Sequence, residues 1–169
     1  LLDALRGQNL DVGDVDSVIL THVHLDHAGG AGLLMQELPN ARCVVHRYGA
    51  PHMIDPGKLI KGATAVYGEE TFRQLYGDIR PIAEERIRTV EDGERLMFAD
   101  RELEFIHTEG HARHHYCIVD RASNGVFTGD CFGNPGFLGT GNEVIEQDPE
   151  RRLALIHKAL RCVDNFIDP

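Results

Sequence analysis

Hydrophobic and polar positions alternate in two different ways along the chain. Up to residue 80, short apolar runs are separated by stretches in which apolar residues recur every three or four positions, a spacing typical of helices. The pattern predicts the end of a helix at 1–9, a strand at 17–20, a helix at 31–38, a buried strand at 41–46 and a helix at 69–77. Prolines and glycines interrupt residues 47–80, which we expect to form an insertion of helices and loops.

After residue 80 the spacing between apolar residues becomes shorter and is typical of strands. Strand-like runs separated by turn signals predict an antiparallel meander, with strands at 86–90, 94–99, 102–108, 115–120 and 125–130. Near the end, Asp148 is suited to cap a helix over residues 148–166, and Pro149 suits its first turn. This helix would pack one apolar face on a sheet, formed by Leu153, Ile156, Leu160 and Val163.

Composition limits the class of protein. A chain of 169 residues with 42% hydrophobic content is long enough for a single domain over residues 1–169. A formal charge of −10 without a basic cluster argues against nucleic-acid partners. The sequence has neither an apolar run of about 18 to 20 residues nor a basic, apolar leader, which favours a cytoplasmic protein without membrane contact.

The cysteines and most of the histidines have simple structural interpretations. The four cysteines form no CxxC pair, and we expect reduced core thiols, including Cys131 beside Asp130. We expect His107 to be structural, and His46 and His52 to lie at the surface. One of the neighbouring imidazoles, His114 or His115, could support a metal ligand by a hydrogen bond.

The segment THVHLDHAGG, residues 21–30, is different because it places three imidazoles and a carboxylate within a few positions. If the chain stays extended past the strand, His22 and His24 point to the same side. Asp26 and His27 then lie at the turn into the next helix, and two glycines let the backbone bend tightly. Neutral imidazole and carboxylate suit zinc, iron or manganese. The segment therefore predicts a metal site.

Three ordered motifs carry a family resemblance. HVHLDH at 22–27 resembles the HxHxDH signature of the metallo-β-lactamase superfamily, and HTEGH at 107–111 and FTGD at 127–130 follow in the family's order. The resemblance covers residues 15–133 and is closest in character to the glyoxalase II-like and lactonase-like branches. It implies an α/β fold, the αββα sandwich, which we expect here in partial form, without its amino-terminal strands and its usual carboxyl-terminal part.

The resemblance also implies a set of metal ligands: His22, His24, Asp26, His27, His111 and Asp130. His22, His24 and His111 would hold a first ion, Asp26 and His27 a second, and Asp130 would bridge them. Two dications about 3.5 to 4 Å apart generate hydroxide near neutral pH and polarise a carbonyl group. Asp26 would orient that hydroxide and pass a proton to the leaving group, which makes it the expected catalytic residue.

We therefore expect a dinuclear zinc hydrolase, with iron or manganese as alternatives, that cleaves a small thioester, ester or lactone. The family's final histidine ligand is missing, because His157 alone follows Asp130 and falls within the predicted helix. This leaves open a metal-binding module that is catalytically impaired by an incomplete second site. A third alternative is a diiron oxidase with a flavin partner, although an imidazole at position 24, where such proteins carry an acid, favours hydrolysis.

Overall fold

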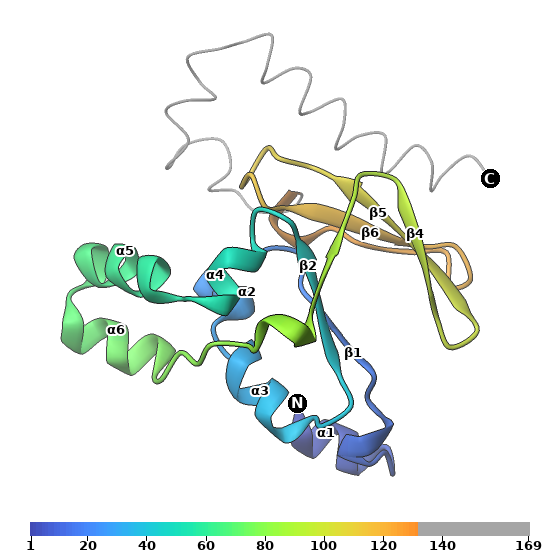
Figure 1. Cartoon of the computed structure of the whole chain (residues 1–169), viewed down its shortest axis with the longest axis horizontal. Helices are drawn as coiled ribbons and strands as arrows, with labels where there is room; N and C mark the ends of the chain where they lie inside the picture. The colour runs from blue at the N-terminus through green and yellow to red at the C-terminus, as the bar shows by residue number, and fades with distance from the viewer. Residues whose placement is uncertain (132–169) are drawn as a thin grey trace, which may run out of the picture. The chain divides into compact units, whose positions relative to one another are not determined.

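The computed structural model describes residues 1–131, which belong to two compact units (Figure 1). The first unit is Leu1–Thr89, and the second begins at Val90. The single domain expected over residues 1–169 stays a prediction. The helix predicted at 148–166, together with His157 and Cys162, lies outside the described residues.

The first unit combines helices with a small sheet. Its elements are α1 (Leu2–Gly7), η1 (Val12–Asp14), β1 (Ser17–Ile19), α2 (Leu25–Ala28), α3 (Ala31–Glu37), β2 (Arg42–His46), α4 (Ala50–Ile54), α5 (Gly57–Tyr67), α6 (Glu69–Tyr76), η2 (Glu84–Arg86) and β3 (Ile87–Val90), whose last residue is the first of the second unit. β1 pairs in parallel with β2, in the register Ser17↔Arg42, and β3 completes the order β1-β2-β3. α2 and α3 form the crossover between the two parallel strands, as parallel pairing requires.

The core of this unit lies around β2. Cys43, Val44 and Val45 are all buried, as expected for a central strand that is covered on both faces. Met35 and Leu38 from α3 and the segment after it belong to the same apolar core as Cys43 and Val45. Burial raises the pKa of the Cys43 thiol to about 12, so this cysteine behaves as a neutral core residue, as predicted.

Arg86 anchors the end of α3. Its guanidinium donates hydrogen bonds to the carbonyl oxygens of Met35, at 2.7 Å, and of Ala41, at 3.1 and 2.7 Å, and also to that of Leu38. The last carbonyls of a helix have no partner within the helix, and a cation is favoured beside them. Arg86 therefore connects the strand that it precedes, β3, to the helix that follows the histidine-rich loop.

The insertion predicted over residues 47–80 is more helical than the sequence indicated. The single helix predicted at 69–77 is α6, and the structure adds α4 and α5 before it. α5 and α6 lie side by side (Figure 1). Phe72 is the buried residue of α6, and its ring lies 5.5 Å from that of Tyr76.

The second unit is an antiparallel sheet. Its elements are β4 (Glu94–Phe98), β5 (Arg101–His107), β6 (Tyr116–Asp120), β7 (Gly125–Phe127) and η3 (Gly129–Cys131), with strand order β4-β5-β6-β7. The predicted meander is correct for these strands but wrong for residues 86–90, which form β3 beside β2 in the other sheet. Ile87 packs against the core of the first unit, so burial decides the sheet that this strand joins.

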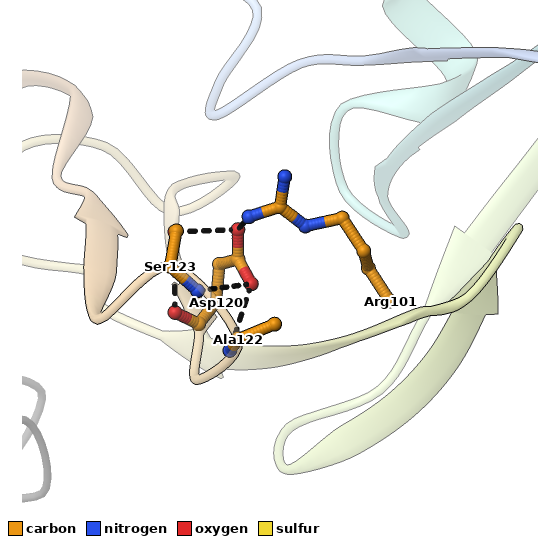
Figure 2. Close-up of polar contacts among 4 residues, drawn as sticks. All are labelled: Arg101, Asp120, Ala122 and Ser123. Carbon is orange, nitrogen blue, oxygen red and sulfur yellow. Dashed lines mark hydrogen bonds and ion pairs between the residues drawn. The ribbon is translucent and has the colours of Figure 1, made fainter.

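A polar network closes the turn between β6 and β7 (Figure 2). The buried carboxylate of Asp120 pairs with Arg101 and accepts a 2.7 Å hydrogen bond from the hydroxyl of Ser123. The backbone N–H groups of Ala122 and Ser123 donate to its other oxygen, at 3.2 and 3.4 Å. These contacts, led by the Ser123 hydroxyl, hold the pKa of Asp120 below its ordinary range.

None of the helices within residues 1–131 has the length and apolar character needed to cross a bilayer.

Candidate metal centre

Three imidazoles gather where the loop after β1 runs into α2: His22 and His24 lie in the loop, and His27 lies on the helix. Leu20 extends the pairing of β1 by donating to the Val44 carbonyl at 3.0 Å, the chain bends at Thr21, and His24, just before α2, is extended with a ψ of 149°. The ring centroid of His22 lies 4.8 Å from that of His24 and 4.1 Å from that of His27. The histidines of the HVHLDH motif therefore come together within the first unit.

His22 is the most deeply placed of these side chains, since it has no exposed surface. Its Nδ1 lies 3.2 Å from the hydroxyl oxygen of Thr21, which fixes the orientation of the ring. Histidines that bind metals are held in this way through the ring nitrogen that does not face the ion. In this orientation Nε2 of His22 would be the ligand atom.

Asp26 and His27 lie on α2, as the sequence predicted for the turn into the helix. The carboxylate oxygen Oδ2 of Asp26 lies 3.6 Å from Nε2 of His27, and the Asp26 side chain is 65% exposed. An exposed carboxylate beside an imidazole can exchange protons with solvent or with a bound molecule.

The paired glycines after this motif have a role different from the predicted one. Gly29 and Gly30 adopt ordinary right-handed helical angles, with φ of −57° and −81°, so they supply no unusual bend. A Cβ on Gly29 would lie 2.5 Å from the carbonyl oxygen of Leu25, closer than real contacts allow. Gly29 is thus required for a close approach of backbone to backbone.

The remaining candidate ligands meet in the second unit. His111 lies in the loop after β5, and Asp130 lies in η3 after β7. His111 Nε2 is 3.5 Å from Asp130 Oδ2, and the two side chains are 18% and 20% exposed. The hairpin of β6 and β7 brings these two residues together.

A buried cluster supports the His111 loop. The hydroxyl of Thr108 lies 2.6 Å from His115 Nδ1, and the Thr108 N–H donates to the His115 carbonyl at 3.0 Å. The His115 ring in turn lies edge-on to that of His111, with centroids 5.9 Å apart. The hydrogen bond from His114 or His115 to a metal ligand stays a prediction, because the printed partner of the His115 ring is Thr108, which is not a predicted ligand.

Two thiols complete the cluster, which was not predicted from the sequence. The ligand atoms of His115, Cys117 and Cys131 all lie within 4.8 Å of one another, and all three residues are buried. A hydrogen bond with Cys117, followed by burial, raises the pKa of Cys131, so the metal-free thiol is neutral near pH 7. The register of β6 against β5 and β7 builds this group, and no local sequence pattern marks it.

Two other histidines show where the predictions were right and wrong. His107 is structural, as expected, because it is buried and its Nε2 lies 3.3 Å from the Val90 carbonyl oxygen. His46 was expected at the surface, but it is fully buried, and the Tyr48 N–H donates to its Nδ1 at 3.1 Å. The reason is that His46 ends the central strand β2, where it continues the run of buried positions.

The predicted ligands thus form one group in each unit. The first unit gathers His22, His24, Asp26 and His27, and the second gathers His111 with Asp130. The convergence of both groups on shared ions stays a prediction. Imidazole nitrogens with carboxylate oxygens make a donor set that fits zinc, iron or manganese, so both groups suit divalent metals.

Comparison with known proteins agrees with this donor pattern. The sequence signature of the Metallo-beta-lactamase superfamily matches residues 1–152. The chain belongs to this superfamily. Members of the superfamily bind metal ions, and its relatives include hydrolases.

Curated relatives are distant. The metallo-beta-lactamase fold-containing protein ST1585 of Sulfurisphaera tokodaii is 29% identical over 122 residues, which are 70% of this chain and 45% of that protein. The Atrochrysone carboxyl ACP thioesterase of Aspergillus fumigatus is 26% identical over 79% of this chain and 23% of its own length. The Hydroxyacylglutathione hydrolase of Aeromonas salmonicida is 26% identical over 92% of this chain and 48% of its own length. The chain spans less than half the length of each.

The fold of the chain also matches solved structures of the superfamily. The crystal structure of ST1585 matches with a TM-score of 0.60 and 30% identity, covering 71% of this chain and 47% of that one. The α/β fold class of the superfamily, implied by the three motifs, is confirmed by this match.

Proposed function

We propose that this protein is a metal-dependent hydrolase that cleaves a small carboxyl derivative, a thioester in preference to an ester or a lactone, with two zinc ions. The observation that carries the proposal is the gathering of the three imidazoles of His22, His24 and His27 beside the carboxylate of Asp26. A structural loop has no need for this density of metal-binding side chains, because each buried ring nitrogen requires a partner.

The roles that we propose for the residues are those implied by the family resemblance. His22, His24 and His111 would hold one ion, Asp26 and His27 the other, and Asp130 would contact both. Ions bound there would lower the pKa of a water molecule and polarise the substrate carbonyl. The loop supplies nitrogen and oxygen ligands in neutral or anionic form, which is the form that binds a metal.

Asp26 is the expected catalytic residue. Its exposed carboxylate can accept a proton from the attacking water and deliver it to the leaving sulfur or oxygen. Water then adds its oxygen to the carbonyl carbon, the carbon–sulfur or carbon–oxygen bond breaks, and the products are a carboxylic acid and a thiol or an alcohol.

The preference for a thioester is supported by the names of two relatives, a thioesterase and a hydroxyacylglutathione hydrolase. Both names describe the release of an acyl group from a carrier.

Metal content and turnover of the purified protein test the proposal together. The substrates are the acetyl and octanoyl thioesters of N-acetylcysteamine, with a phenyl ester and a lactone as comparisons. We expect His22→Ala to lose bound zinc and turnover, and Asp26→Asn to lower kcat by about 100-fold or more.

The matched control is His52→Ala, which removes an imidazole of α4 and should keep both metal and turnover. Stoichiometric metal without turnover on any of the substrates would contradict the proposal and indicate a metal-binding module. Turnover with iron but none with zinc would contradict the choice of metal.

A further inference from the structure

A pocket of about 410 Å³ adjoins the histidine-rich loop, entirely within the first unit. Its wall is formed by α2 and the glycines after it on one side and by the end of α6 on the other, through Leu25, Asp26, Gly29, Gly30, Leu75 and Tyr76. Small-molecule sites usually measure about 300 to 1,000 Å³. The expected catalytic carboxylate, Asp26, is therefore part of the wall of a pocket large enough for a small ligand.

The side of this pocket formed by α6 is apolar. Leu75 is 60% exposed, so a large apolar side chain is left in contact with water at the pocket. Tyr76 is held in place by its neighbours, because its ring lies 5.5 Å from that of Phe72 and 6.0 Å from that of Tyr67. A ligand that covered Leu75 would remove apolar surface from water.

The glycine side of the pocket leaves space for a ligand. A Cβ added to Gly30 would meet no atom within 4 Å, and its φ of −81° is one that any residue adopts. The backbone is therefore exposed toward the pocket without being strained. A ligand can approach closely here, and a side chain can be introduced here without disturbing the fold.

The charge of the wall limits the kind of ligand. Asp26 is the one ionisable carboxylate among the six lining residues, and none of the six carries a positive charge. Such a wall does not favour a phosphate or a carboxylate, which require cationic partners.

We propose that this pocket binds the apolar acyl chain of the substrate, with the reacting carbonyl carbon at the Asp26 end and the chain along Leu75 and Tyr76. The inference rests on the proposed hydrolase function and specifies its substrate class as acyl derivatives of medium chain length. The acyl chain is the favoured occupant because Asp26 is itself part of the pocket wall. An acyl chain bound in the pocket is covalently attached to the carbonyl group that reacts beside Asp26.

Chain length in the substrate tests this assignment. For the octanoyl thioester of N-acetylcysteamine we expect Leu75→Asn to raise KM by about tenfold with little change in kcat, since the lost contact is remote from the reacting carbon. For the acetyl thioester the same substitution should leave KM unchanged within about twofold. The control is Val66→Asn, which also replaces an exposed apolar helix residue by asparagine. Val66 lies on α5, is 76% exposed and does not line the pocket.

A second variant fills the pocket instead of weakening its wall. Gly30→Val introduces a side chain where space is open, so the protein should fold normally, as circular dichroism would show. It should shorten the preferred chain and thus raise the ratio of acetyl to octanoyl kcat/KM by about tenfold. An unchanged ratio in a folded Gly30→Val protein would overturn the assignment.

Binding without reaction separates this inference from the proposed function. Octanamide is uncharged and is not a thioester, and its binding to the purified protein can be followed by NMR. We expect Leu75→Asn to weaken octanamide binding by about tenfold and Val66→Asn to leave it unchanged. That pattern in a protein without turnover would support the pocket and contradict the hydrolase. Turnover whose chain-length dependence is the same in Leu75→Asn as in the unmodified protein would support the hydrolase and overturn the pocket.

Discussion

The two units hold their candidate ligands in different ways. In the first, His22, His24, Asp26 and His27 come from one short segment, and their spacing alone brings them together. In the second, a pair of residues separated by a whole hairpin meets because strand pairing brings their loops to one end of a sheet. A site of the first kind depends on the packing beneath one loop, and a site of the second kind depends on strand register.

The supports differ accordingly. The histidine-rich loop of the first unit leads into α3. The backbone of Arg80 approaches this helix closely at Gly32, and the Arg86 side chain anchors its carboxyl-terminal end. The hairpin of the second unit is closed by the network around Asp120. Substitutions at these supports, away from the ligands themselves, test whether each site depends on its own kind of support.

The largest effect is expected at the close approach in α3. A Cβ on Gly32 would lie 1.9 Å from the Arg80 carbonyl oxygen, so Gly32→Ala must separate two backbone segments. We expect a loss of about 3 kcal/mol in the free energy of unfolding, measured with urea, and weaker zinc binding. The matched variant Gly30→Ala has open space and should gain about 0.4 to 1 kcal/mol. Equal stability of the two variants would show that α3 does not depend on this contact.

Arg86 should have the next largest effect. Arg86→Ala leaves the carbonyls at the end of α3 without their cationic donor, and we expect it to lower the free energy of unfolding by about 2 kcal/mol. Arg86→Lys keeps the charge but loses the forked geometry, so it should recover part of the loss. Arg88→Ala, at an exposed position of β3, should change stability by less than about 0.5 kcal/mol. A loss at Arg88 as large as that at Arg86 would point to the strand instead of the helix end.

The smallest effect is expected in the second unit and depends on pH. The folded structure holds the pKa of Asp120 below its ordinary range, so the ionised carboxylate stabilises the fold at neutral pH. That stabilisation is complete above the ordinary pKa of an aspartate, near 4. It is lost as the pH falls through the lower pKa that Asp120 has in the folded protein, because the carboxylate is then protonated.

Asp120→Asn should therefore lower the thermal midpoint at pH 7, and the difference from the unmodified protein should disappear in acid. Thermal unfolding followed by circular dichroism between about pH 7 and pH 2 measures this difference. Asp3→Asn is the control, because the Asp3 side chain is 95% exposed and its pairing with Arg6 is a surface contact. A difference at Asp120 that stays constant with pH would show that the carboxylate's charge is not the cause.

Local patterns predicted the elements that carry the first group of ligands. The strand at 17–20, the helix at 31–38 and the strand at 41–46 correspond to β1, α3 and β2, because each is an apolar run bounded by turn residues. The prediction failed for a strand that could have joined either of the two sheets. Residues 86–90 have the pattern of a strand, but the pattern does not name the neighbour, and the structure pairs them with β2 instead of β4.

The candidate site shows the same division. The motif at 22–27 identified the candidate ligands of the first unit, because metal-binding residue types at such close spacing rarely serve a purely structural purpose, and the family resemblance carried by FTGD implied Asp130. The role of Gly29 and the burial of His46 could not be predicted. Both depend on which atoms lie across from the residue, and a single sequence does not contain that information.

The sequence by itself determined the superfamily, the order of the motifs and the clustering of candidate ligands in the histidine-rich loop, because these depend on residues that are neighbours along the chain. The tertiary structure decided the contact of His111 with Asp130, the thiol cluster below it and the pocket between α2 and α6. Each of these joins residues that are distant in sequence, and their contact depends on strand register and side-chain packing.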